Sequence, residues 1–173
     1  MKNRSLFIIS IGSLVLLTMA CAVKSENSLE KIDQLKAVYL FNFTKYISWP
    51  NSRSESTSAD IRICVDAPTV FREFLAEVTN NRRVGKSQRF VRVVSLDVAE
   101  ACELVYLGKA ENTLPDTIKN SVIVADATGG DFLGPDIIFY TSEKKLRFEI
   151  DLKRLNKKEV FVSSELLKLA KVK

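Results

Sequence analysis

The stretch that most constrains the fold is residues 35–50, LKAVYLFNFTKYISWP. Its apolar side chains recur at the i, i+3, i+4 and i+7 spacing that one face of an α-helix produces. The buried stripe that we expect contains Leu35, Tyr39, Leu40, Phe43, Tyr46 and Ile47. The positions expected to face solvent are Lys36, Thr44, Lys45 and Ser48. The stretch therefore predicts an aromatic core helix.

The only tryptophan of the chain, Trp49, directly precedes Pro50. A residue before proline is sterically pushed out of the α region. We therefore expect the helix to run from about Ser28 to about Ser48, and the indole to fold back onto the core as a large apolar group.

Residues 1–22 resemble a secretory signal peptide. Lys2 and Arg4 form a positive n-region, residues 6–17 form an apolar h-region, and residues 20–22 fit an A-x-A cleavage site. The apolar run is too short to span a membrane. Lipidation at Cys21 is the alternative to cleavage after Ala22. Both predict an exported, periplasmic protein in which residues 23–28 form a mobile lead to a domain at residues 29–173.

Export changes how the net charge of the chain is interpreted, because the signal peptide is removed and nucleic acid is absent from the usual surroundings of an exported protein. The signal holds two of the 26 basic residues and none of the 21 acidic ones, which leaves 24 basic residues and a net charge of +3. Basic residues near the C-terminus are interspersed with acidic ones, which is typical of a solvated face. We therefore expect no nucleic-acid partner.

Two cysteines, Cys64 and Cys102, remain once the signal is removed. In an oxidising compartment they favour a structural disulfide, and two buried free thiols are the alternative. They do not form a C-x-x-C redox pair, and the chain has no histidine that could complete a metal site.

Apolar runs in the rest of the chain predict strands that alternate with helices. Strands are expected at residues 61–65, 90–94, 104–107, 122–125, 137–140, 146–152 and 160–162. Helices are expected at residues 68–78, 151–157 and 163–170, and residues 141–145 are expected to close a hairpin. This pattern predicts a single α/β domain with a mixed central β-sheet flanked by α-helices.

Sequence signatures of enzymes are missing from the chain. Without histidine there is no Ser-His or Cys-His dyad, and neither a G-x-S-x-G motif nor a glycine-rich phosphate loop occurs. Asp126, Gly129, Gly130 and Asp131 indicate a polar turn, because their spacing lacks the regular ligand positions of an EF-hand. We expect a non-catalytic protein without a cofactor.

Four motifs in order resemble those of the YfiR family of periplasmic regulators. The first is aromatic-Asn-Phe-x-Lys-aromatic-x-x-Trp-Pro, and the residues at the matching places are Tyr39, Asn42, Phe43, Lys45, Tyr46, Trp49 and Pro50. The others are two cysteine-bearing strands at residues 61–65 and 102–107, and a closing run at residues 146–152 and 162–170. The resemblance covers residues 35–172.

The resemblance implies an exported protein that binds the periplasmic domain of a membrane-bound diguanylate cyclase and represses it, which lowers cyclic di-GMP signalling and links the protein to biofilm regulation. It also implies a homodimer. The chain departs from the family in having Gly134-Pro135 in place of a Gly-Gly pair and in lacking the cysteines of a second disulfide. The alternative function is a periplasmic sensor that binds a small ligand.

Candidate partner contacts come from the end of the chain. Arg147 and Glu149 are expected on the polar face of a strand, and together with Leu155 they are candidates for the surface offered to a partner. The alternative for Glu149 is a cross-strand ion pair. Lys45 is expected to be a solvated helix residue, and Asn42 a hydrogen-bonded buried amide.

Overall fold

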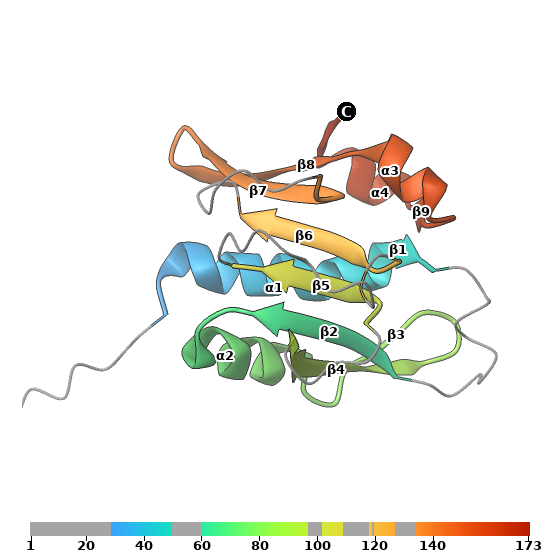
Figure 1. Cartoon of the computed structure of the whole chain (residues 1–173). Coiled ribbons are helices and arrows are strands. Elements are labelled where there is room, and N and C mark those ends of the chain that lie inside the picture. Colours follow the sequence, from blue (N-terminus) through green and yellow to red (C-terminus); the bar gives the residue numbers. More distant parts are fainter. Residues whose placement is uncertain (1–28, 50–59, 97–101, 109–117, 119, 127–133) are drawn as a thin grey trace, which may run out of the picture.

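The computed structural model describes residues 29–49, 60–96, 102–108, 118, 120–126 and 134–173 (Figure 1). The predictions for the signal peptide, the lead, Cys21 and Pro50 lie outside these ranges. Within them the chain forms an eight-stranded mixed sheet, a two-stranded sheet and four α-helices. The predicted α/β class with a mixed central sheet is confirmed.

The large sheet has a parallel centre and antiparallel additions. Its parallel strands are β2 (Ile61–Asp66), β4 (Arg89–Ser95), β5 (Leu104–Leu107), β6 (Val122–Asp126) and β7 (Ile137–Ser142). β8 (Lys145–Ile150) pairs antiparallel with β7, and β3 (Arg83–Val84) pairs antiparallel with β4. Every residue of β5 and β6 is buried, as expected of strands covered on both faces.

The strand order is β10-β8-β7-β6-β5-β2-β4-β3, with β10 (Lys171–Val172) at one edge, and it places β2 at a turning point of the topology. The chain first moves from β2 through α2 (Thr69–Thr79) to β4 on one side. It then returns to add β5, β6 and β7 on the other side. In open α/β sheets the carboxyl ends of the strands at such a reversal are the usual place for a ligand.

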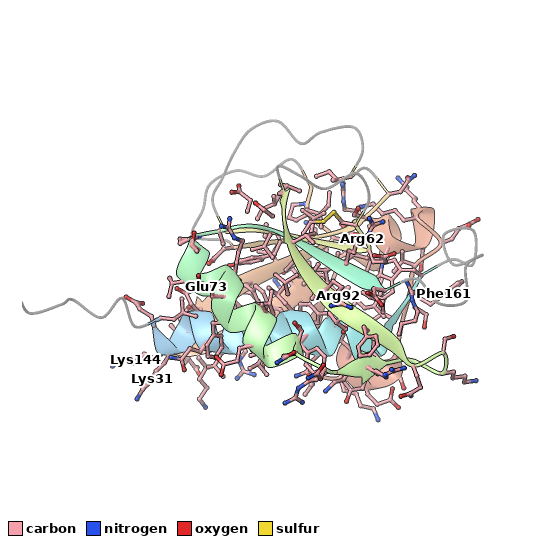
Figure 2. The ribbon with its side chains drawn as sticks, turned by 90° about the horizontal axis from the view of Figure 1, so that it is seen from below. Lys31, Arg62, Glu73, Arg92, Lys144 and Phe161 are labelled. Atoms are coloured by element: carbon pink, nitrogen blue, oxygen red, sulfur yellow. A yellow bond between two sulfur atoms is a disulfide. The ribbon has the colours of Figure 1, made fainter. Side chains whose placement is uncertain are left out.

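Helix α1 (Lys31–Tyr46) lies across one face of the sheet and packs against α2 (Figures 1 and 2). On its inner side the ring of Phe43 lies 5.7 Å from that of Phe139 and 5.2 Å from that of Phe148. The helix ends at Tyr46 and continues into β1 (Ile47–Ser48), which pairs antiparallel with β9 (Phe161–Val162). The aromatic stretch therefore forms the core helix that the sequence predicts.

The predicted buried stripe of α1 is wrong in part. Leu35 and Tyr46 are 49% and 40% exposed, whereas Lys36, expected in solvent, is only 8% exposed. Thr44 is also buried, and its hydroxyl donates to the Phe41 carbonyl at 2.6 Å. Six of the seven residues at positions 37–43 are apolar, and α1 contacts α2, α4 (Ser164–Leu167) and β8, so the period alone does not select the inner face.

The chain ends in two short capped helices and an edge strand. α3 (Leu152–Lys157) begins after Asp151, whose carboxylate accepts a hydrogen bond from the Arg154 amide. α4 (Ser164–Leu167) begins after Ser163, which caps it as predicted. The chain then forms β10 (Lys171–Val172), a parallel edge strand beside β8 that the sequence did not predict.

Candidate functional site

The disulfide between Cys64 and Cys102 is confirmed, with a Cα–Cα distance of 5.9 Å. Both cysteines are buried in a small apolar cluster with Val105 and Ile123. Cys64 alternates along β2 with Ile63 and Val65, which belong to the larger core, so the bridge lies on the sheet face opposite α1. A loop closed over a separation of 38 residues stabilises the fold by about 4 kcal/mol in the chain-entropy model.

The candidate partner residues fall into different environments. Arg147 is exposed on β8, and Glu149 forms the cross-strand ion pair considered from the sequence, with Lys171 Nζ at 2.7 Å. Leu155 is 0% exposed, so its prediction as a surface residue is wrong. It faces the core because α3 directs its two leucines, Leu152 and Leu155, toward the main apolar cluster.

The aromatic motif of α1 is mainly structural. Tyr39 packs its ring against Phe148 at 5.3 Å, in the same cluster as Phe43. Asn42 is half-buried, and its amide oxygen accepts a hydrogen bond from the exposed Lys45 ammonium at 3.0 Å. Lys45 therefore has the solvated environment that the sequence predicts.

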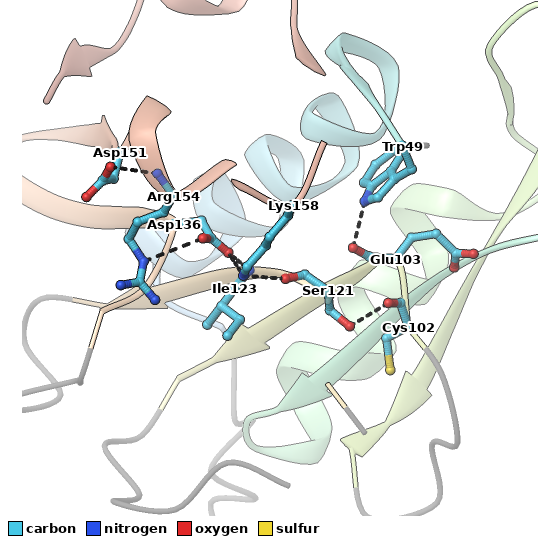
Figure 3. Close-up of polar contacts among 9 residues, drawn as sticks. All are labelled: Trp49, Cys102, Glu103, Ser121, Ile123, Asp136, Asp151, Arg154 and Lys158. Carbon is cyan, nitrogen blue, oxygen red and sulfur yellow. Dashed lines mark hydrogen bonds and ion pairs between the residues drawn. The ribbon is translucent and has the colours of Figure 1, made fainter. Parts of the chain in front are cut away.

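Trp49 lies near the C-terminal end of this motif, directly after β1. It is half-buried against the core, and its indole N–H donates to the Glu103 carbonyl at 2.8 Å (Figure 3). The predicted apolar packing of the indole is therefore supplemented by a hydrogen bond that ties the end of α1 to the start of β5.

A cavity of about 430 Å³ opens at the carboxyl ends of β2, β5, β6 and β7. The first turns of α1 and the start of α2 complete its wall. Gly108 permits the close approach of two strands there, because its amide donates to the Asp66 carbonyl at 2.8 Å. A Cβ at this position would lie 3.1 Å from that oxygen and 3.2 Å from the Ala67 side chain.

Lys36 is the central charge of this cavity wall. Its ammonium donates to Asp33 at 2.8 Å and also contacts the Asp126 carboxylate at the end of β6. Burial alone would lower the pKa of Lys36, but the hydrogen bonds and negative charges of Asp126 and Asp33 outweigh it and raise the pKa. The amine is therefore held protonated and does not serve as a nucleophile.

Tyr106 lines the same cavity from β5 and is only 2% exposed. Its ring stacks on Phe71 of α2 with centroids 5.0 Å apart. Burial, and then the charges of Asp126 and Asp33, raise the pKa of the Tyr106 phenol. The cavity wall therefore combines a protonated amine, carboxylates and a phenol whose pKa is raised.

The opposite ends of the strands, where β7 begins, hold a second buried carboxylate, Asp136 (Figure 3). It accepts hydrogen bonds from the Ile123 amide at 2.8 Å and from the Lys158 ammonium at 2.5 Å, and the Arg154 Nε lies 3.7 Å away. Gly134 has φ +75°, and a Cβ there would lie 2.3 Å from the Arg154 guanidinium. The positive φ and the nearby guanidinium therefore require a glycine at position 134.

The sequence reasoning missed the residues that form the cavity wall. Asp126 was predicted in a polar turn, but it is the last residue of β6 and is buried against Lys36. One sequence pattern could have identified Asp126 as a cavity residue. It directly follows four apolar residues of a predicted strand, and α/β proteins bind ligands at the carboxyl ends of such strands. Gly129, Gly130 and Asp131 lie outside the described residues.

Across the described ranges, no three cysteine or acidic residues are grouped so as to hold a metal ion. Nor does any helix in them have the length and apolar character needed to cross a bilayer. No curated protein matches the chain. A family model described as YfiR/HmsC-like does match, over residues 33–171. The chain therefore belongs to the YfiR/HmsC-like family of periplasmic regulatory proteins.

Proposed function

We propose that the protein is an exported, non-catalytic regulator that binds the periplasmic domain of a membrane-bound diguanylate cyclase and holds the cyclase inactive. Family membership supports this function, because the family is regulatory and periplasmic. The buried disulfide between Cys64 and Cys102 agrees with an oxidising compartment.

The observation that carries the proposal is an apolar face of α1 that nothing in the described chain covers. Leu35, Val38 and Tyr46 are 49%, 39% and 40% exposed. At 100° per residue they fall within one arc of the helix, and we call these three residues the outer α1 surface. Apolar side chains grouped on one face of an exported domain favour a protein partner.

A binding experiment with matched variants tests the proposal. The mature chain is titrated with the isolated periplasmic domain of a cyclase from the same cell, and cyclic di-GMP is measured after co-expression of both full proteins. Val38→Asp on the outer α1 surface is expected to weaken the complex at least about tenfold, because a carboxylate would be desolvated at the interface. Val172→Asp, at a site 47% exposed on β10, is the control and is expected to bind as the wild type does.

Two results would contradict different parts of the proposal. A wild-type protein that binds no cyclase domain at micromolar concentrations contradicts repression by direct contact. A Val38→Asp variant that binds like the wild type contradicts the assignment of the outer α1 surface as the interface. The polar face of β8 is then the next candidate interface. Arg147→Glu would then be the next variant. A dimer, which the family resemblance implies, is tested by light scattering of the same samples.

A second candidate function is a periplasmic small-ligand sensor, and the cavity at the carboxyl ends of the strands favours it. Its volume, about 430 Å³, is within the range of known small-molecule sites. The first turns of α1 line the cavity while Leu35 faces outward from the same turns, so one helix belongs to both surfaces. Thermal-shift screening of the wild type tests this function, because a ligand that binds only the native state raises the melting temperature.

A further inference from the structure

We infer that the edge of the sheet formed by β3 binds the surface of an anionic phospholipid bilayer. β3 is the last strand in the order of the sheet, and five exposed cations surround it. We call these residues the basic edge, and they are Lys45, Arg82, Arg83, Lys86 and Arg92. The inference goes beyond the proposed function, because this surface contacts lipid and not the cyclase.

The positive charge of the mature chain is concentrated around this edge. Residues 78–95 contain five basic residues and no acidic one, whereas the mature chain as a whole has a net charge of +3. The rest of the mature chain is therefore net negative. Of the five basic residues, Arg89 has a side chain only 15% exposed and pairs with Glu103 at 3.4 Å, and the other four are exposed.

Aromatic rings hold these cations in place without neutralising them. Lys45 Nζ lies 4.4 Å from the centroid of the Phe41 ring, and the guanidinium carbon of Arg82 lies 5.3 Å from the same centroid. The guanidinium carbon of Arg83 lies 3.9 Å from the centroid of the Phe90 ring. A ring attracts a cation through its quadrupole and, unlike a carboxylate, leaves the net charge unchanged.

Two carboxylates accompany the basic edge. Asp60 pairs with Arg92 at 2.7 Å, and Glu77 is exposed in the last turn of α2. Within the described ranges, the other four cations of the basic edge form no ion pair. Helices α1 and α2 both end here, and each helix C-terminus contributes about half a negative charge. Five cations against two carboxylates still leave a positive excess.

The cations of the basic edge lie on both faces of the sheet. Val91 belongs to the main core on the α1 side, so Arg92, the next residue of β4, points to the opposite face (Figure 2). Arg82 instead lies against a ring of α1, and Lys86 is exposed in the turn between β3 and β4. A flat bilayer approached edge-on meets cations from both faces, whereas an extended acidic peptide on one face meets only some of them.

The nearby cavity does not gather these charges around a small anion. It has a volume of about 260 Å³, lies between α2 and β4, and is lined by Arg92 alone of the five cations. Each lysine or arginine close to an anionic leaflet raises the affinity for the membrane about fivefold, and the attraction falls off within a Debye length. The basic edge therefore suits a reversible, salt-sensitive contact with lipid headgroups.

Sedimentation with two kinds of vesicle tests the inference. The mature wild-type protein is mixed with vesicles of phosphatidylcholine alone and with vesicles of phosphatidylcholine and phosphatidylglycerol in equal parts. Binding is expected to the anionic vesicles only. It is expected to disappear as the sodium chloride concentration approaches about 1 M, where the Debye length is about 3 Å.

Matched lysine variants make the test specific to the basic edge. Lys86→Gln is expected to weaken binding to the anionic vesicles about fivefold, through loss of one cation near the surface. Arg82→Gln is expected to do the same, and Lys86→Gln decides the test if Arg82→Gln does not fold. Lys144→Gln is the control, because Lys144 is exposed in the turn between β7 and β8, near the other edge of the sheet and away from Arg92 (Figure 2). It removes the same charge from an equivalent turn and is expected to bind as the wild type does.

Several results would overturn the inference. Binding to neither kind of vesicle, equal binding to both, or binding that persists in high salt contradicts an electrostatic contact with anionic lipid. Equal losses in Lys86→Gln and Lys144→Gln would show that net charge alone attracts the protein, which overturns the assignment of the basic edge. Binding to soluble polyglutamate but not to vesicles would overturn the membrane contact and assign the basic edge to an acidic protein partner. The vesicles contain no cyclase, and cyclase binding is measured without lipid, so either result can fail without the other.

Discussion

Asp126 and Asp136 are both buried carboxylates paired with a lysine, yet they lie at opposite ends of the strands in different surroundings. The side chain of Asp136 is fully buried. It accepts a hydrogen bond from a backbone amide and forms ion pairs with a lysine and an arginine. Asp126 ends β6 beside a cavity of about 430 Å³, which Lys36 and Tyr106 also line. A buried carboxylate in this fold can therefore be either enclosed by protein groups or placed at the border of a cavity.

The difference between the two carboxylates is one of accessible space: the side chain of Asp126 is 7% exposed and that of Asp136 is 0% exposed. Around Asp136, three elements converge and leave the carboxylate enclosed (Figure 3). Around Asp126, the described residues of the wall include three carboxylates and one cation, and they face a volume that a small molecule can occupy. The Asp136 cluster joins β6, β7 and α3. The cavity wall at Asp126 is suited to binding a small molecule.

The largest expected effect comes from removing the enclosed charge. Asp136→Asn would leave the Lys158 ammonium, whose side chain is 14% exposed, without its carboxylate. Breaking a buried pair in this way destabilises a fold by about 3–5 kcal/mol. Urea unfolding at neutral pH, followed by circular dichroism, measures the change in the free energy of unfolding.

Asp60→Asn is the matched control for this prediction. It removes the same kind of charge from an ion pair with Arg92, whose side chain is 63% exposed. Surface pairs contribute about 0–1 kcal/mol, so a small change is expected. If the two variants lose similar amounts of unfolding free energy, the enclosure of Asp136 does not determine how much this residue contributes to stability.

A smaller effect is expected at the cavity. Lys36→Met leaves Asp126 without its lysine, but the carboxylate borders a space that water can enter. We therefore expect a loss of about 1–3 kcal/mol, the range for a polar group that loses a partner and keeps partial solvation. Unfolding under the same conditions as for Asp136→Asn gives the comparison, and a loss as large as for Asp136→Asn would contradict it.

Much of the fold could be predicted because its signals are local. The apolar runs of β5 and β6, the Ser163 cap and the hairpin between β7 and β8 each depend on a few neighbouring residues. The disulfide could be predicted because only two cysteines remain after the signal. The edge strand β10 was missed, since two residues carry too little pattern to separate a strand from a helix end.

The ion pairs of the two buried carboxylates could not be predicted because they join distant parts of the chain. Lys36 and Asp126 are 90 residues apart, and Lys158 and Asp136 are 22 apart. Lys36 was expected in solvent because a lysine inside an apolar helix has no local reason to be buried. Leu155 was misplaced for the related reason that a helix of six residues carries no clear period.

The smallest expected effect is a change in the response to alkaline pH at the cavity. Burial and the charges of Asp126 and Asp33 raise the pKa of Tyr106 above its ordinary value of about 10. In the unfolded chain the phenol loses its proton near that value, while the folded protein keeps it. The unfolded state then binds fewer protons, so stability present below about pH 10 falls as pH rises, by up to about 1.4 kcal/mol per pH unit. The raised pKa of Lys36 acts in the same direction.

Tyr106→Phe separates the contribution of the phenol from that of Lys36. The variant keeps the ring that stacks on Phe71, so its free energy of unfolding at pH 7 is expected to remain within about 1 kcal/mol of the wild type. Between pH 9.5 and pH 11, limits chosen to bracket the ordinary tyrosine pKa of about 10, its stability is expected to fall less steeply. Urea unfolding at several values in this interval measures both slopes. Parallel slopes would show that Tyr106 ionises as it does in the unfolded chain, and the cavity would then lack the charged, enclosed character that distinguishes Asp126 from an ordinary strand end.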